Sequence, residues 1–210
     1  MNRREGSADA ILVFRLARLP DSPQDCSSFQ RGTKYTSPLD DTVFETQAEL
    51  QTLQKLLDSS FEKVGGKLAG FDQSQRMSAK QLAGFKGVRL VSIASINSRM
   101  EPRVAPRSAA FLHGKFYLAA NSRSTIAHRL RAHPTTAITY YEIHLLIMAH
   151  GIASFLGRED PHFAELGREW KEAFHGGRDA LEGIDTFVVI EATHLVAFAA
   201  RPDLYPLAWK

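Results

Sequence analysis

The spacing of hydrophobic residues divides the chain into an early helical part and a later strand-rich part. Between residues 42 and 64, apolar side chains recur at intervals of three or four positions, which predicts an amphipathic helix. Thr42 and Glu45 have the spacing of a capping box that would begin this helix. Ser78 and Gln81 have the same spacing and predict a second, short helix that ends near Gly84.

From residue 88 onward, short segments rich in β-branched and alternating apolar residues predict antiparallel strands. His113-Gly114 predicts a tight turn, and His150-Gly151 predicts a bulge. Helices are expected over residues 124–132 and after Asp160-Pro161. Hairpin-linked strands with few inserted helices favour an antiparallel barrel over a doubly wound sheet. The predicted strands are residues 88–96, 104–112, 116–120, 137–142 and 144–155, with a terminal pair over 187–190 and 195–199.

The first 40 residues show no sustained periodicity, so we expect a flexible tail over residues 1–40 and one domain over 41–210. Residues 1–35 hold six basic and four acidic side chains, so the domain itself is close to neutral. It lacks the concentrated basic face of nucleic-acid-binding proteins. No apolar run approaches the roughly 20 residues that cross a bilayer. The expectation is a cytoplasmic domain that binds neither nucleic acid nor membrane.

Residues 121–130 place hydroxyl groups and an arginine where a strand meets the start of a helix. The free N–H groups of a helix N-terminus favour an anion, and Arg123 would add a charge-assisted hydrogen bond to a phosphate. The alternative is that Ser122 or Ser124 only caps the helix, which is the commoner use of such a hydroxyl. The following motifs favour the phosphate interpretation.

The order of motifs from residue 85 to residue 206 resembles the pyridoxamine 5′-phosphate oxidase-like family of flavin-binding split barrels. The resemblance is carried by Val104-Ala105-Pro106, by the helix that ends at Leu130-Arg131-Ala132-His133-Pro134, and by His150-Gly151-Ile152-Ala153. It implies an α+β, mainly β fold: a six-stranded antiparallel split β-barrel with flanking helices. Such barrels form homodimers that bind a flavin in each of two interface grooves.

The resemblance also implies a cofactor, FMN or alternatively the deazaflavin coenzyme, and an oxidoreductase that transfers hydride to or from a small molecule. In such an enzyme the flavin performs the redox step, and the sequence itself identifies no catalytic residue. Thr125 and Ile126 stand where the oxidase has an Arg-Lys pair, which argues against pyridoxamine phosphate oxidase activity itself. Carried over by position, the cofactor-binding residues are Ala105, Pro106 and Arg107 at the flavin ring, and Ser122, Arg123, Ser124, Thr125 and His128 at the phosphate.

The alternative function is a non-catalytic carrier or sensor of flavin or haem built on the same barrel. A haem would need a histidine ligand, for which His128 and His150 are the candidates. The eight histidines show no compact ligand spacing, and no set of cysteines completes a zinc site. No metal site is therefore predicted.

Overall fold

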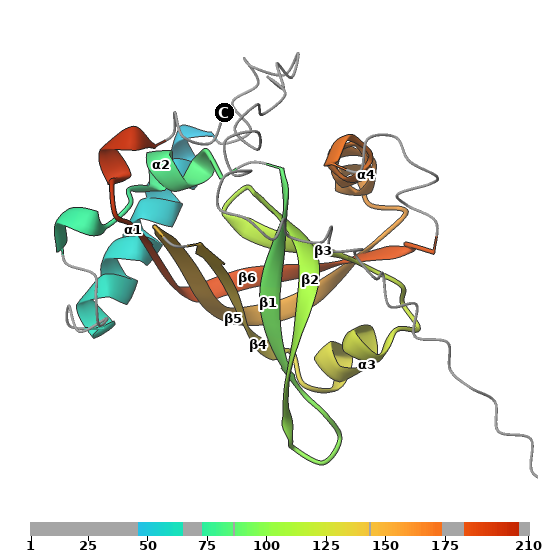
Figure 1. Ribbon diagram of the computed structural model, residues 1–210. Helices are drawn as coiled ribbons and strands as arrows, with labels where there is room; N and C mark the ends of the chain where they lie inside the picture. The colour runs from blue at the N-terminus through green and yellow to red at the C-terminus, as the bar shows by residue number, and fades with distance from the viewer. Residues whose placement is uncertain (1–45, 65–72, 86, 143, 174–182, 206–210) are drawn as a thin grey trace, which may run out of the picture. The chain divides into compact units, whose positions relative to one another are not determined.

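Six antiparallel strands form the centre of the structure, a computed structural model that describes residues 46–64, 73–85, 87–142, 144–173 and 183–205. They close into a barrel in the order β1-β2-β3-β6-β5-β4 (Figure 1). The mainly β, six-stranded antiparallel barrel with flanking helices predicted from the sequence is confirmed. The strands are β1 Val88–Ile96, β2 Pro102–Leu112, β3 Lys115–Ala120, β4 Thr135–Glu142, β5 Leu145–Gly157 and β6 Thr186–Ala199.

Helices flank the barrel on several sides (Figure 1). Helix α1 lies against β6 and α2, and its Leu53 and Leu57 are buried in the core. None of the helices in the described ranges is long and apolar enough to cross a membrane. The helices are α1 Gln47–Val64, α2 Ala79–Ala83, α3 Thr125–Ala132 and α4 Pro161–Ala173, with short 3₁₀ helices η2 Gln73–Gln75 and η3 Pro202–Leu204.

Alternation along the strands creates an inner and an outer layer of buried side chains. The inner layer fills the barrel and includes Ile93, Ile138 and Ile147. The outer layer lies on the opposite face of β2, β3 and β6, where α4 covers it. Trp170 of α4 is buried there, with its ring centroid 5.1 Å from that of Phe187 in an edge-on arrangement. Helix α4 is therefore held to the barrel by an apolar contact of its own.

Several local predictions are confirmed. Ser78 and Gln81 form a capping box at the start of α2. His113 and Gly114 both have positive φ angles, 52° and 69°, and make the tight turn from β2 to β3. The register of β5 against β6 shifts between His150 and Gly151, where the bulge was expected. The first two features lie within a few neighbouring residues, whereas the register shift also involves β6, which has one extra residue opposite it.

Two predicted boundaries are wrong or displaced. β6 is one continuous strand, whereas the sequence predicted a pair of strands over 187–190 and 195–199. Residues 191–194 interrupt the apolar pattern with exposed or partly exposed side chains but continue the strand, and the register shift of β5 lies opposite them. Helix α1 begins after a different capping box, in which the Thr46 N–H donates to Glu49 Oε2 (2.6 Å) and the Glu49 N–H donates to Thr46 Oγ1 (3.2 Å). The predicted box at Thr42 and the predicted tail over residues 1–40 lie outside the described residues.

The barrel is split between β1 and β4. These strands pair only from Ser92 to Ala94, opposite Thr139 to Ala137. Beyond Ala94, β1 continues with β2 alone, so the β1–β2 hairpin projects beside α3 (Figure 1). The Thr136 hydroxyl donates to the Ala94 carbonyl (2.6 Å) at the point of separation. The split leaves space between the projecting hairpin and α3.

Candidate functional site

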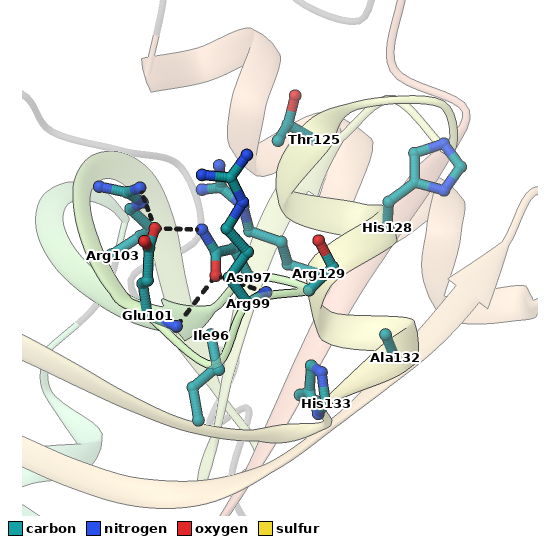
Figure 2. Close-up of a pocket in the computed structure, with 11 residues that line it drawn as sticks. Ile96, Asn97, Arg99, Glu101, Arg103, Thr125, His128, Arg129, Ala132 and His133 are labelled. Carbon is teal, nitrogen blue, oxygen red and sulfur yellow. Dashed lines mark hydrogen bonds and ion pairs between the residues drawn. The ribbon is translucent and has the colours of Figure 1, made fainter.

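A groove of about 600 Å³ lies between the projecting end of the β1–β2 hairpin and α3 (Figure 2). Its volume falls within the range of about 300–1,000 Å³ that is usual for small-molecule sites. The hairpin contributes the turn from Ile96 to Arg103, and α3 contributes one face that includes Thr125, His128 and Arg129. These three positions lie on one side of a helix because they are separated by three and four residues.

The hairpin turn is held by the side chain of Asn97. Its Oδ1 accepts hydrogen bonds from the N–H groups of Arg99 (3.0 Å) and Glu101 (2.9 Å). Its Nδ2 donates to Glu101 Oε2 (2.8 Å). Such local bonds fix a turn that would otherwise be free to move. Arg99 is consequently presented to the groove from an ordered backbone.

The groove carries an excess of positive charge. Glu101, the acidic side chain in its lining, is paired with Arg103 (2.5 Å). Within the described residues, the guanidinium groups of Arg99 and Arg129 have no carboxylate partner. Figure 2 shows both side chains directed into the groove. Two unpaired guanidinium groups in one concave site favour an anionic ligand.

The loop before α3 is held by protein partners. The backbone N–H and the hydroxyl of Ser122 both donate to the Asp185 carboxylate (2.6 Å each). The hydroxyl bond lowers the pKa of Asp185, and the nearby Arg158 adds to this effect. Ser124 is the N-cap of α3 and accepts from the Ala127 N–H. These serines therefore fix the direction in which α3 leaves the barrel.

Known structures share this barrel. No protein-family model matches the chain, and no curated protein matches it. A conserved hypothetical protein of Mycobacterium tuberculosis is similar over 64% of this chain and 92% of its own, with 19% identity and a TM-score of 0.51. The chain therefore shares its fold, a six-stranded antiparallel barrel, with that structure.

Two further solved structures are similar, both with TM-scores of 0.42. One is an FAD-binding protein from Mesorhizobium loti, 16% identical over 52% of this chain and 82% of its own. The other is a pyridoxamine 5′-phosphate oxidase-related, FMN-binding protein from Nostoc punctiforme, which is 15% identical over 54% of this chain and 75% of its own. Because these scores lie below 0.5, the fold assignment depends on the barrel itself and on the mycobacterial structure.

The split-barrel groove contains two of the eight residues expected to bind a cofactor. Thr125 and His128 line it, whereas the lining does not include Ser122, Arg123 or Ser124. The three residues expected at the flavin ring lie on β2, outside the lining of the groove, and pair with residues 91–93 of β1. These are Ala105, Pro106 and Arg107.

Sequence reasoning missed the charged residues of the groove, Arg99, Arg103 and Arg129. Asn97-Ser98-Arg99 is visible in the sequence as a turn, and Arg129 follows Thr125 by four positions on the predicted helix. Nothing local indicates that this turn and this helix face each other. Their approach follows from the short pairing of β1 with β4, which is a tertiary feature.

Proposed function

We propose that this split barrel binds a phosphate-bearing flavin-type cofactor, with the phosphate in the groove between the β1–β2 hairpin and α3. The observation that carries the proposal is the pair of guanidinium groups, Arg99 and Arg129, without carboxylate partners among the described residues. A phosphate monoester carries about −1.5 to −2 charges at neutral pH, which two arginines would balance. The residues present therefore fit the anionic end of such a cofactor.

Four side chains would hold the phosphate. Arg99 and Arg129 would donate charge-assisted hydrogen bonds, and the Thr125 hydroxyl and His128 line the same space. Ser122 and Ser124 would act by fixing the start of α3, since their hydroxyl groups bond to Asp185 and to the Ala127 N–H. Arg123 is exposed in the loop before α3 and does not line the groove, so we propose that it adds positive charge near the phosphate and not a direct contact.

The flavin ring would extend from the groove along β2, where Ala105, Pro106 and Arg107 are the proposed contacts. Arg107 is held by a hydrogen bond from its guanidinium to the Pro106 carbonyl (2.8 Å). A bound flavin supplies hydride transfer, so the proposed activity is that of an FMN- or deazaflavin-dependent oxidoreductase. The chain's own residues would bind and orient the cofactor, and we assign no catalytic residue.

The proposal is tested by titrating the protein with FMN and with riboflavin, which lacks the phosphate, and following flavin fluorescence. A hydrogen bond to a charged group contributes about 1.5–3 kcal/mol, so Arg129→Ala should weaken FMN binding about 10- to 100-fold. Riboflavin binding should not change. Arg168→Ala on the exposed face of α4 is the matched control and should leave both affinities unaltered.

The outcomes separate the parts of the proposal. Equal losses of FMN and riboflavin affinity in Arg99→Ala and Arg129→Ala would show that the arginines do not contact the phosphate. If neither FMN nor the deazaflavin coenzyme binds at micromolar concentrations, the flavin proposal is wrong. Bleaching of the bound flavin by NADPH, followed by reoxidation with an acceptor, would distinguish an oxidoreductase from a carrier.

A second candidate is a non-catalytic haem-binding protein. His128 and His133 both line the groove beside the two arginines, so an imidazole ligand and partners for the haem propionates lie in one site. His150, the other expected haem ligand, does not line the groove and instead lies with its ring 5.6 Å from that of His194. A Soret band after addition of haemin, lost in His128→Ala but retained in His150→Ala, would support this candidate.

We further propose that two copies of the chain associate. Large hydrophobic side chains are exposed on the strands and at the hairpin turn, where a second copy would cover them. Light scattering during size-exclusion chromatography would measure the mass directly, and a monomer at micromolar concentration would contradict the proposal. These side chains are Leu90, Met100, Val104, Tyr141 and Ile152.

A further inference from the structure

A cluster of histidine and glutamate side chains lies away from the groove, where three elements meet. His113 is in the turn between β2 and β3. His162 and Glu165 are in the first turns of α4, three residues apart on one helix face. Glu49 is in the first turn of α1. The elements come from distant parts of the sequence, which is why no local spacing indicates this cluster.

The potential ligand atoms are close together. A ring nitrogen of His113, a ring nitrogen of His162 and a carboxylate oxygen of Glu165 all lie within 4.8 Å of one another. His162 Nδ1 lies 3.3 Å from Glu165 Oε2, and His113 Nδ1 lies 3.2 Å from Glu49 Oε1. In a tetrahedral zinc site with bonds of about 2.0–2.1 Å, ligand atoms are about 3.3–3.4 Å apart. Small side-chain rotations would therefore bring the set to coordination distance.

The Nδ1 atom of His113 is buried beside the Glu49 carboxylate. It has no hydrogen bond among the residues that the structure describes. The Glu49 carboxylate lies 3.2 Å from it and forms an ion pair with the ring when the imidazole is protonated. A buried polar atom without a hydrogen-bond partner destabilises a fold, so such an atom calls for an explanation.

The Glu49 carboxylate is itself held in place. Its Oε2 accepts the hydrogen bond from the Thr46 N–H that caps α1, which leaves Oε1 on the side of His113. That backbone hydrogen bond is the main reason why the pKa of Glu49 is lowered. The cluster thus offers two imidazoles and two carboxylates, one of which has its orientation fixed by a helix cap.

We propose that His113, His162 and Glu165 bind a divalent transition-metal ion, zinc in the first instance, with Glu49 as the adjacent carboxylate. Two imidazoles and a carboxylate are a ligand set that zinc accepts in tetrahedral geometry. Zinc binds imidazoles in their neutral form, so binding releases a proton from any histidine that is charged. Coordination changes no oxidation state and needs no other reactant. The proposal does not depend on the proposed flavin site, because no residue is shared between them.

The bound ion would link three elements of the structure. It would tie the first turns of α4 to the β2–β3 turn and, through Glu49, to the start of α1. A ligand that binds only the folded chain stabilises it by mass action. Zinc should therefore raise the midpoint of thermal unfolding as well as bind with a stoichiometry of one.

The test is a titration of the full chain, first stripped with a chelator, with zinc chloride in competition with a chromophoric chelator. His113→Asn is the sharpest variant, because asparagine accepts the left-handed conformation of this turn while the imidazole is lost. His162→Ala removes the second imidazole. Each should weaken zinc binding by more than the about 10- to 100-fold typical of losing an outer-shell partner of a metal ligand.

Two controls distinguish this site from incidental binding. His194→Asn disrupts the other close histidine pair, with His150, and should leave zinc affinity unchanged. Glu49→Gln keeps a side chain that can cap α1 but removes its charge, and should weaken zinc binding about tenfold. Wild-type protein that fails to bind one zinc at micromolar concentration, or His113→Asn and His162→Ala variants that bind zinc like the wild type, would overturn the proposal.

Discussion

Replacing Gly151 with alanine would add a methyl group where the backbone of β6 already lies. A Cβ at this position would be 2.3 Å from the Glu191 carbonyl oxygen and 2.9 Å from its carbonyl carbon. Cβ atoms essentially never come within 3.0 Å of a heavy atom outside their own residue and its chain neighbours. Because the atoms in the way belong to a paired strand and not to a flexible side chain, the strands must separate locally.

Overpacking of this kind typically destabilises a protein by about 1–3 kcal/mol, and the Gly151→Ala variant should lie near the upper value because a backbone has to move. For a chain of this length, each kcal/mol lowers the midpoint of thermal unfolding by about 2–4 °C, so the expected decrease is about 6–12 °C. Urea unfolding followed by circular dichroism would measure the free energy directly.

Gly87→Ala provides the matched control. Gly87 has a positive φ of 78°, but a Cβ there would meet no atom of the described residues within 4 Å. Its replacement should cost about 1–2 kcal/mol for the left-handed backbone alone. If Gly151→Ala loses less than about 1 kcal/mol, or no more than Gly87→Ala, the close approach of β5 and β6 at the bulge is not as described.

Three further predictions concern stability. Trp170→Ala should destabilise the fold by about 3–5 kcal/mol, because it empties the contact between α4 and the barrel; chemical unfolding would measure the loss, and a change below about 1 kcal/mol would contradict that packing. Ser122→Ala removes the hydroxyl hydrogen bond that lowers the pKa of Asp185, so the variant should be less stable than the wild type at neutral pH. The ordinary pKa of this carboxyl is 3.8, and the difference in stability should disappear as the pH falls from there through the lowered pKa of the folded state. Burial, and then the charges of His150 and Lys63, lower the pKa of His194 from its ordinary value of 6.5. The folded chain therefore binds fewer protons at this histidine than the unfolded chain does. The free energy of unfolding should consequently fall as the pH drops below 6.5. His194→Asn should flatten this acid-induced loss in thermal unfolding measured against pH, and an unchanged slope would contradict the assignment.

The parts of the fold that could be predicted from the sequence are those that depend on neighbouring residues. The strand Val88–Ile96 was predicted with its observed bounds, because a run of β-branched residues ends at an Asn-Ser-Arg turn. The capping box at Ser78 is equally local. The start of α1 is different, since Thr42 and Thr46 are both followed three residues later by glutamate. Local pattern alone cannot choose between them.

The candidate sites could be predicted only in part for a related reason. The sequence places Thr125 and His128 on the correct helix, but Arg99 approaches that helix only because β1 leaves β4 early. The partner of Ser122 is Asp185, 63 residues later in the chain. His113, His162 and Glu165 meet through the packing of α4 on the barrel. Pairings of this kind depend on tertiary packing that no local pattern encodes.

The position of β6 in the barrel has a consequence for how the chain folds during synthesis. β6 pairs with β3 on one side and with β5 on the other, and it is the last of the six barrel strands to leave the ribosome. Until then, β3 and β5 each present an unpaired edge, which is the kind of surface that associates with other chains. A chain that stops before residue 186 should therefore aggregate, whereas completion of β6 removes both edges in one step.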